Sequence, residues 1–435
     1  MAIYVRTVIS PSHHKVLFPF VFYIFNPTEM AFIQRSRVLL NSGCFQTISL
    51  RSLATTTKPS MAVLDDFLDI ANTHFADIPS EKLSVTIFND ALPVYTHPGT
   101  TQTQRQAVVD SLKPFTIIST MRERTPLPAA LLRELPNLKL LLATGTQFET
   151  FDLAAARELG IIVAAAPGKG RTDGKLAGHR PARPKLDIKK GGGHPTTQHA
   201  WALILALARN VANDDAVMKD PTRKGWQTQL AQGLTGATLG VVGLGRLGAA
   251  VARVGALAWG MKVICWSENL TQEKANQKAE EMGLRAVGGG LDPTAPTFRV
   301  VSKEELFRNA DVVTLHNVLS ERSRGLVGVT ELQFMKDSAL LVNTSRGPLI
   351  DDAALYDALQ QGKIGGAALD VFDIEPLPAD SPWRSQEWGH GGRSNLLVTP
   401  HMGYVEDGIM HTWYEETAEN VERWLEGQEI LHRLN

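Results

Sequence analysis

The fold of this chain is decided by the stretch Leu239-Gly240-Val241-Val242-Gly243-Leu244-Gly245-Arg246-Leu247-Gly248. The apolar run 238–242 predicts a buried strand, and the alanine-rich run 249–252 predicts a helix. In this context Gly243 permits a tight turn, Gly245 lets the backbone approach a pyrophosphate, and Gly248 lets the helix pack closely on the strand. A second apolar strand at 261–266 completes a βαβ unit. The stretch therefore predicts a dinucleotide-binding loop at a helix N-terminus.

The composition of the whole chain fits a globular protein of two domains. The chain has 435 residues and a formal net charge of −1, so nothing global suggests a nucleic-acid partner. The apolar run 16–25 is about half as long as a bilayer span requires, and no membrane partner is expected. Cys44 and Cys265 cannot build a disulfide framework, which favours a reducing compartment. Cys265, in the second predicted strand, reads as a small core hydrophobe.

The first sixty residues differ from the rest of the chain. They contain six Lys/Arg and one acidic residue, Glu29, and they are rich in serine and threonine. This composition is typical of a mitochondrial transit segment, while a disordered tail or a start codon placed too far upstream are the alternatives. We therefore expect a cytoplasmic or mitochondrial protein whose residues 1–60 are a disordered or targeting segment.

Strands and helices alternate on both sides of the glycine loop, which predicts parallel, doubly wound sheets. Before the loop we expect strands at 82–92, 114–120, 138–143 and 161–165, with helices at 127–135 and 151–159. The expected domains are a substrate domain over 61–200, completed by a C-terminal helical segment within 403–435, and a nucleotide domain over 201–402.

Two segments interrupt this alternation, and one helix stands out. Residues 168–193 carry eight basic and two acidic residues among many Gly and Pro, so we expect an exposed, mobile insertion. It is either an electropositive rim that attracts anionic ligands or a neutral insertion, such as an intron translated in an incorrect gene model. Residues 287–297 form a second irregular insertion. The helix predicted over 194–209 is apolar nearly all round and should be buried, between domains or at a dimer seam around Trp201.

Polar side chains follow three apolar strands in the second half of the chain. Arg346 follows one strand, Asp370 and Glu375 follow the next, and His401 follows a third. Because ligands bind beyond the carboxyl ends of parallel strands, all of these side chains are predicted to face one crevice. An arginine fork can hold a carboxylate, a histidine can give a proton to an adjacent ketone oxygen, and a nearby carboxylate favours imidazolium. These residue types fit hydride transfer to a 2-oxo acid.

From about Met61 onward the chain resembles the D-isomer-specific 2-hydroxyacid dehydrogenase family. The resemblance rests on four motifs: the glycine loop, Asn343-Thr-Ser-Arg-Gly347, Leu369-Asp-Val-Phe372 with Glu375-Pro-Leu-Pro378, and Pro400-His401. It implies a Rossmann-type nucleotide-binding domain and a flavodoxin-like substrate domain with a cleft between them. It also implies an NAD(P)-dependent oxidoreductase, a homodimer, acting on a small D-2-hydroxy or 2-oxo acid, like glyoxylate and hydroxypyruvate reductases or phosphoglycerate dehydrogenases.

Site residues carry over from the family motif by motif. The catalytic residues implied are Arg346, Glu375 and His401. The cofactor-binding residues implied are Gly243, Gly245, Arg246, Leu247, Gly248, Ser267, Glu268, His316, Thr344 and Asp370, with Asp370 at the nicotinamide carboxamide. The substrate-binding residues implied are Thr144, Gly145, Thr146 and Arg122. No metal is expected.

Departures from the family pattern limit the assignment of cofactor and substrate. Ser267 stands where NAD-preferring members usually carry aspartate, and Glu268 follows it. NAD is therefore expected as cofactor, with NADP possible. Met402 and Tyr404 replace commoner small residues and could shape the substrate pocket.

Two rival functions remain open from the sequence. Corepressors with this fold, which sense nicotinamide nucleotides, keep the same triad, although residues 1–60 look more like a targeting segment than a peptide-binding scaffold. The other rival is a decayed enzyme whose insertions block the cleft.

Overall fold

The computed structural model describes residues 58–146, 148–175, 194–222 and 226–435. The predictions for residues 1–57, which include Cys44, and for residues 176–193 fall outside this range. The described chain from Lys58 onward is one compact unit built on two parallel β-sheets. The prediction of a doubly wound parallel α/β fold is confirmed.

The first sheet has five parallel strands in the order β2-β1-β3-β4-β5, which is the flavodoxin-like order. Its strands are β1 (Ser60–Val63), β2 (Ser84–Ile87), β3 (Ile117–Thr120), β4 (Leu140–Thr144) and β5 (Ile162–Ala166). The short helices of this region are α1 (Asn72–Phe75), α2 (Gln102–Leu112), α3 (Ala129–Leu132) and α4 (Leu153–Glu158). No sequence pattern predicted β1 or α2.

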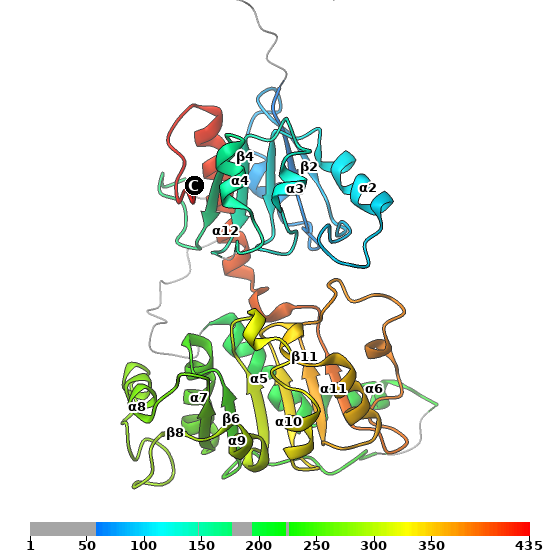
Figure 1. Ribbon diagram of the computed structural model, residues 1–435, viewed down its shortest axis with the longest axis vertical. Coiled ribbons are helices and arrows are strands. Elements are labelled where there is room, and N and C mark those ends of the chain that lie inside the picture. The colour runs from blue at the N-terminus through cyan, green and yellow to red at the C-terminus, as the bar shows by residue number, and fades with distance from the viewer. Residues whose placement is uncertain (1–57, 147, 176–193, 223–225) are drawn as a thin grey trace, which may run out of the picture. The chain divides into compact units, whose positions relative to one another are not determined.

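Alternation along the strands gives this sheet two apolar faces. Successive strand residues point to opposite faces, so Met61 and Ile117 join one core while Ala62 and Ile118 join the other. The last helix, α12 (Asp407–Leu425), covers the first of these faces and packs against β4 and β5 (Figure 1). The chain then ends beside β5, where Ala164 pairs with Arg433 in an antiparallel bridge.

The second sheet has seven parallel strands in the order β12-β11-β10-β9-β6-β7-β8. Its strands are β6 (Thr238–Val242), β7 (Lys262–Trp266), β8 (Phe298–Val300), β9 (Val312–Leu315), β10 (Leu340–Asn343), β11 (Gly366–Leu369) and β12 (Asn395–Val398). The strand order reverses beside β6, because β7 pairs on one of its sides and β9 on the other. The glycine loop that follows β6 therefore lies at the switch point where doubly wound sheets bind dinucleotides.

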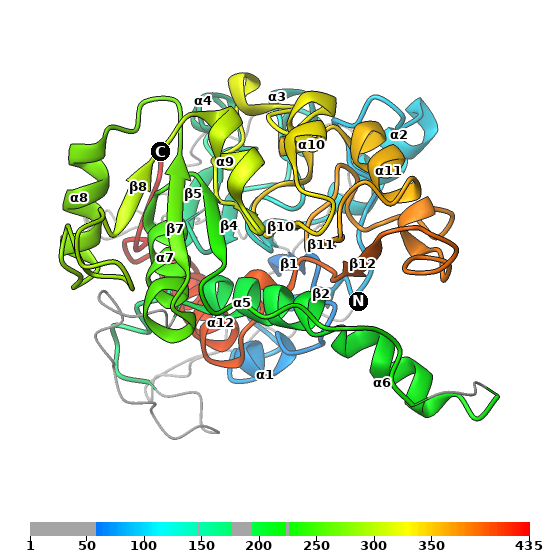
Figure 2. The same ribbon diagram turned by 90° about the horizontal axis from the view of Figure 1, so that it is seen from below.

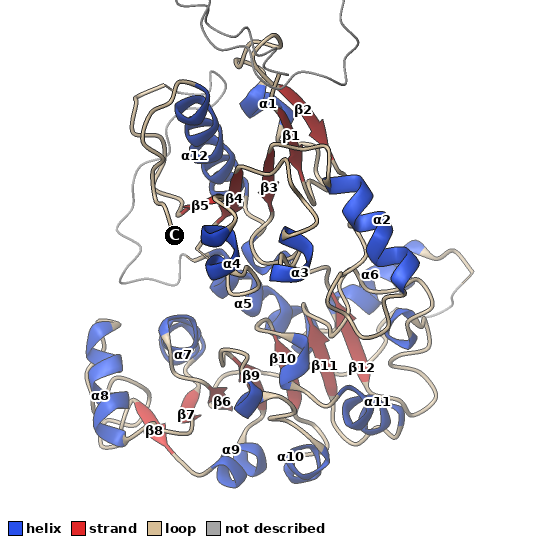
Figure 3. Cartoon of the chain, turned by 45° about the horizontal axis from the view of Figure 1, so that its top comes forward, coloured by secondary structure: helices blue, strands red, loops and turns tan. Residues whose placement is uncertain are grey.

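Helices cover both faces of the second sheet (Figure 3). On one face lie α5 (Pro195–Ala208) and α7 (Arg246–Trp259), with α8 (Gln272–Glu281) beyond them. On the other lie α9 (Lys303–Asn309), α10 (Val329–Phe334) and α11 (Asp352–Gln360). Cys265 in β7 is fully buried, as predicted, and burial raises the pKa of its thiol to about 12. Its side chain therefore serves as part of the core.

Helix α5 packs against the second sheet and α7, and the dimer seam expected around Trp201 stays a prediction. The Trp201 indole is 5% exposed, packs on α7, and donates a hydrogen bond to the Val251 carbonyl at 3.2 Å. The apolar face of α5 that carries Trp201 is therefore buried, as predicted. The helix runs on into α6 (Val211–Lys219), which no pattern predicted (Figure 2).

The start of the predicted insertion 168–193 is anchored rather than free. The backbone N–H groups of residues 168–170 donate to the Glu416 carboxylate, and Arg171 pairs with Asp173 and Glu422. These carboxylates lie on α12 or in the segment itself, so α12 holds residues 168–173 in place. The second insertion, 287–297, folds back through a bridge between Val287 and Pro296, and it exposes Leu291.

In the part of the chain that the structure describes, no helix is both long and apolar enough to cross a membrane. Within the same residues no group of His, Cys, Asp and Glu side chains has the arrangement of a metal site.

Candidate active site

The glycine loop has the geometry that its sequence predicts. Gly243 adopts a φ of 94°, in the left-handed region, and a Cβ there would lie 2.7 Å from Asn317 Oδ1. A Cβ at Gly248 would overlap the carbonyl oxygen of Gly243. By contrast, no described atom lies within 4 Å of a Cβ built at Gly245. Packing therefore requires glycine at positions 243 and 248, whereas Gly245 faces open space.

This open space fits the phosphates of a dinucleotide. Helix α7 begins at Arg246 without a side-chain cap at Gly245, so its first N–H groups and its positive dipole end are available to an anion. Nearby, Asn317 Oδ1 and Thr344 Oγ1 are buried and have no hydrogen-bond partner among the described residues. Buried polar atoms are rarely left unpaired. These two, just past the ends of β9 and β10, are suited to a polar ligand.

The remaining cofactor candidates surround the same loop. Arg246 is exposed and Leu247 half-buried at the start of α7. Ser267 is half-buried just past β7, and Glu268 is exposed beside it. The backbone of His316 follows β9 and borders Gly243, and burial lowers the pKa of the His316 ring to about 4. The ring is therefore neutral near pH 7, with Nε2 2.9 Å from Thr314 Oγ1.

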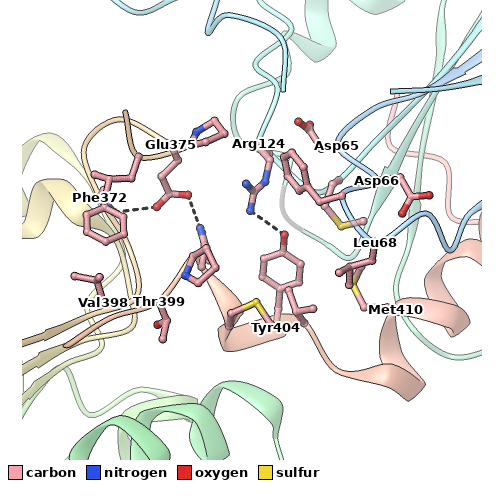
Figure 4. A pocket seen from close by; sticks show the side chains of 18 of the residues that line it. Asp65, Asp66, Leu68, Arg124, Phe372, Glu375, Val398, Thr399, Tyr404 and Met410 are labelled. Atoms are coloured by element: carbon pink, nitrogen blue, oxygen red, sulfur yellow. Dashed lines mark hydrogen bonds and ion pairs between the residues drawn. The ribbon is translucent and has the colours of Figure 1, made fainter. Parts of the chain in front are cut away.

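His401 and Glu375 form a hydrogen-bonded pair past the ends of β12 and β11. The two side chains meet at 2.6 Å, His401 Nδ1 to Glu375 Oε2 (Figure 4). Glu375 Oε1 accepts a second bond from the Phe372 N–H at 2.9 Å. Burial alone would raise the pKa of the Glu375 carboxyl, but the contacts with His401 outweigh it and lower the pKa. The carboxylate is thus ionised near pH 7, and Nε2 is the ring nitrogen left for a substrate.

His401 itself sits in a left-handed conformation, with a φ of 56°. Such a conformation in a non-glycine residue is costly and persists only where the surroundings fix it. Asp370 fixes it, because its carbonyl accepts the His401 N–H and its carboxylate accepts the N–H groups of Met402 and Gly403 at 2.7 and 2.9 Å. His199 Nε2, from α5, lies 3.0 Å from the same carboxylate.

The Asp370 carboxylate makes contacts that the resemblance did not imply. Its side chain is fully buried and is shared by the groups that build the turn at His401, together with Thr399 Oγ1 at 2.6 Å. In this structure the Asp370 carboxylate contacts the protein chain, and its implied contact with a nicotinamide carboxamide stays a prediction. Its observed contacts make it a positioning residue for His401.

Arg346 lies past β10, where the sequence places it, and its guanidinium contacts the carboxylate of Glu123. Glu123 lies just past β3 of the first sheet, so the pair joins the two sheets' strand ends. Burial would raise the pKa of Glu123, but the charges of Arg346 and Arg122 outweigh it and lower the pKa. The site thus already holds one carboxylate on the arginine that the sequence assigns to a substrate carboxylate.

The candidates for substrate binding gather around Tyr404. The Arg122 guanidinium lies 4.7 Å from the centre of the Tyr404 ring, and its backbone N–H donates to Thr144 Oγ1. Thr144 is fully buried, while Thr146 is exposed. The Gly145 N–H, expected near a substrate carboxylate, instead donates to the Ala166 carbonyl at 2.8 Å. In this conformation the Gly145 N–H is therefore not available to a substrate.

A cavity of about 430 Å³ opens beside the His401–Glu375 pair. Its walls come from the β1–α1 loop, the Met121–Arg124 segment and the chain from Val398 to Met410. Figure 4 shows Arg124 donating to the Tyr404 hydroxyl across this cavity, at 3.0 Å. Cavities of roughly 300–1,000 Å³ are the usual size of small-molecule sites.

Sequence reasoning missed Glu123, Arg124, His199 and the loop 65–69. Glu123 and Arg124 had a usable signal, since they follow the buried strand β3 as Arg346 follows β10. His199 had none, because its partner Asp370 lies 171 positions away.

The glycine loop at the switch point, with a histidine–carboxylate pair past neighbouring strand ends, defines a dinucleotide-dependent oxidoreductase. The family model described as "D-isomer specific 2-hydroxyacid dehydrogenase, NAD binding domain" matches residues 201–403. The chain is 31% identical to a glyoxylate reductase of Aeropyrum pernix over 304 residues, covering 68% of this chain and 76% of that protein. It is 30% identical to a D-3-phosphoglycerate dehydrogenase of Archaeoglobus fulgidus, covering 65% of this chain and 44% of that longer protein.

Solved structures agree with these relatives. A phosphoglycerate oxidoreductase from Vibrio cholerae superposes with a TM-score of 0.64 at 30% identity, covering 85% of this chain and 99% of that one. A D-lactate dehydrogenase from Aquifex aeolicus, complexed with NAD and lactic acid, gives a TM-score of 0.57 at 25% identity, with coverages of 84% and 96%. This chain belongs to the D-isomer-specific 2-hydroxyacid dehydrogenase family.

Proposed function

We propose that this protein reduces a 2-oxo acid to the D-2-hydroxy acid, and catalyses the reverse oxidation, with NAD as cofactor. The observation that carries the proposal is the His401–Glu375 pair, joined at 2.6 Å on the wall of a ligand-sized cavity. A corepressor role finds no support in the relatives named above, which are reductases and dehydrogenases.

Each catalytic candidate has one task in this reaction. The Arg346 guanidinium holds the substrate carboxylate, for which the Glu123 carboxylate must give way. His401 Nε2 gives a proton to the carbonyl oxygen, and Glu375 holds the ring and favours its charged form. When bound, the nicotinamide supplies the hydride to the carbonyl carbon. Gly243, Gly245 and Gly248 with the start of α7 would hold its phosphates, and Thr344 and Asn317 offer unpaired polar atoms beside them.

We expect a modest preference for NADH, with measurable use of NADPH. Glu268 follows Ser267 past the end of β7 and can reach a ribose hydroxyl, where a carboxylate repels a 2′-phosphate. The amine of Lys274, the first lysine after Ser267 along the chain, donates to the Asn269 carbonyl. The test is kcat/KM for glyoxylate, hydroxypyruvate and longer 2-oxo acids with each cofactor. A preference for NADPH above about a hundredfold, roughly 2.7 kcal/mol, would overturn this assignment. No turnover of any 2-oxo acid would overturn the function itself.

We propose that residues 1–60 direct the protein to mitochondria and are dispensable for catalysis. Their basic, serine-rich composition supports this, and the first strand of the fold, β1, begins only at Ser60. A chain starting at Met61 should turn over at the full-length rate, and residues 1–60 fused to a fluorescent protein should accumulate in mitochondria. A diffuse cytosolic signal would reject the targeting, and an inactive shortened chain would reject the dispensability.

We further propose a homodimer and a division into domains at about residue 200, with α12 completing the first. Exposed apolar side chains at Val211, Met218, Trp226 and Leu230, on and after the helix that follows α5, offer surface for a second copy beside the seam expected around Trp201. Light scattering should give twice the chain mass, and replacing Trp226 and Leu230 with serine should halve it. A monomeric wild-type protein at micromolar concentration would contradict the dimer.

A further inference from the structure

The wall of the cavity beside His401 is largely apolar, and the loop that supplies part of it has two residues in the left-handed backbone conformation. The loop between β1 and α1 carries Phe67 and Leu68, which are 45% and 56% exposed. Asp65 and Asp69, on either side of them, adopt left-handed φ values of 60° and 51°. Strained backbone that presents large apolar side chains to a cavity is a mark of a binding surface.

The opposite wall of the cavity is also lined by apolar side chains. Met402 follows His401 directly, and Val405 and Met410 line the cavity where the chain turns into α12. Figure 4 places Leu68 beside Met410, so the loop and the start of α12 meet across the cavity. Methionine adapts its shape to irregular apolar ligands. The surface is thus continuous from the loop 65–69 to the imidazole.

Three charged side chains in the wall, Arg124, Arg384 and Asp66, already form hydrogen bonds within the protein. Arg124 donates to the Tyr404 hydroxyl and lies 5.2 Å from the centre of the Phe67 ring. Arg384 donates to the carbonyls of Leu377 and Pro378. Asp66 accepts the N–H groups of Ile70 and Ala71. A phosphate in this cavity would meet the negative charge of Asp66, and each of the two arginines already donates to an oxygen of the protein.

Resting on the proposed function, we infer that the substrate is a 2-oxo acid with a bulky apolar side chain, branched aliphatic or aromatic, and that this side chain fills the cavity between the loop 65–69 and residues 402–410. The inference limits the expected substrates to 2-oxo acids with a large side chain, because glyoxylate, which has no side chain, leaves the cavity empty. The hydride and proton transfers are those of the proposed reaction, with no further reactant.

The first test compares substrates on the full-length protein with NADH. For 4-methyl-2-oxopentanoate and phenylpyruvate, kcat/KM should exceed that for glyoxylate and for 3-phosphohydroxypyruvate by about one to two orders of magnitude, because each buried methylene adds several-fold. Higher kcat/KM for glyoxylate or the phosphorylated acid would overturn the inference while leaving the proposed function standing. No reduction of any 2-oxo acid would overturn the proposed function.

The second test changes the wall. Leu68→Gln should lower kcat/KM for 4-methyl-2-oxopentanoate about tenfold relative to that for glyoxylate. Leu257→Gln is the matched control, since Leu257 is 53% exposed on α7 and lies outside the cavity wall; it should leave the ratio unchanged. An unchanged ratio in the Leu68 variant would overturn the inference.

A binding measurement separates the pocket from the chemistry. In calorimetry, 4-methylpentanoate, which has no ketone, should bind the wild-type protein more tightly than acetate, and Leu68→Gln should remove that difference. Equal affinities for the two acids would overturn the apolar pocket even in an active enzyme. Tighter binding of 4-methylpentanoate without turnover of any 2-oxo acid would uphold the pocket and overturn the proposed reaction.

Discussion

Replacing His401 with alanine should lower kcat for 2-oxo acid reduction by about two to four orders of magnitude, the usual cost of losing a general acid. The expected cause is loss of the proton donor at Nε2, since Nδ1 is already bonded to Glu375. The affinity for NADH, measured by fluorescence titration, should barely change, because the glycine loop lies past a different strand. A fully active variant would refute the assignment.

Two further variants separate chemistry from folding. Because His401 has a φ of 56°, alanine also adds backbone strain at this position. Asparagine tolerates the left-handed region better, so His401→Asn should retain the thermal stability of the wild type while losing kcat to the same extent. His390→Ala, at an exposed loop position, is the control for loss of a histidine and should leave kcat unchanged. If His401→Asn kept wild-type kcat, the ring would have no part in proton transfer.

Local sequence patterns were sufficient for the nucleotide-binding half of the site. The glycine loop could be predicted because its requirements are local: Gly243 needs a left-handed φ and Gly248 a close approach to the strand. Arg346, Glu375 and His401 could be predicted as neighbours because parallel strands end at one edge of a sheet. Boundaries were less accurate, as when the helix expected over 127–135 reduced to α3, which begins after Pro128.

Contacts between distant segments could not be read in this way. The rule about strand ends says which edge a side chain occupies, but not which group it meets across the site. Glu123 was therefore missed as the partner of Arg346, 223 positions away. The resemblance placed Asp370 at a ligand and gave no sign of the contacts that its carboxylate makes within the chain. Its burial depends on the turn at 401–403 folding back onto it.

The exchange of Glu375 for glutamine should move the pH dependence of the reaction. Because the pKa of Glu375 is lowered, its carboxylate stays ionised throughout the assay range and is protonated only as the pH falls through that lowered value. In the glutamine variant the negative charge beside His401, which favours a protonated ring, is absent at every pH. Reduction needs the protonated ring. Its alkaline limb should therefore shift to lower pH by about one unit, with roughly tenfold lower kcat/KM at pH 8.

The rate of the reverse reaction should change in the opposite direction, which tests whether the charge of Glu375 is the cause. Oxidation of the hydroxy acid needs the neutral ring, and its acid limb should also move to lower pH, which raises the relative rate near pH 6. A loss of structure alone would lower the rates of both reduction and oxidation without shifting the limb of either pH profile. Glu387→Gln, at an exposed carboxylate paired with Arg393, is the matched control and should keep both profiles. If Glu375→Gln also kept both profiles, Glu375 would only support the fold.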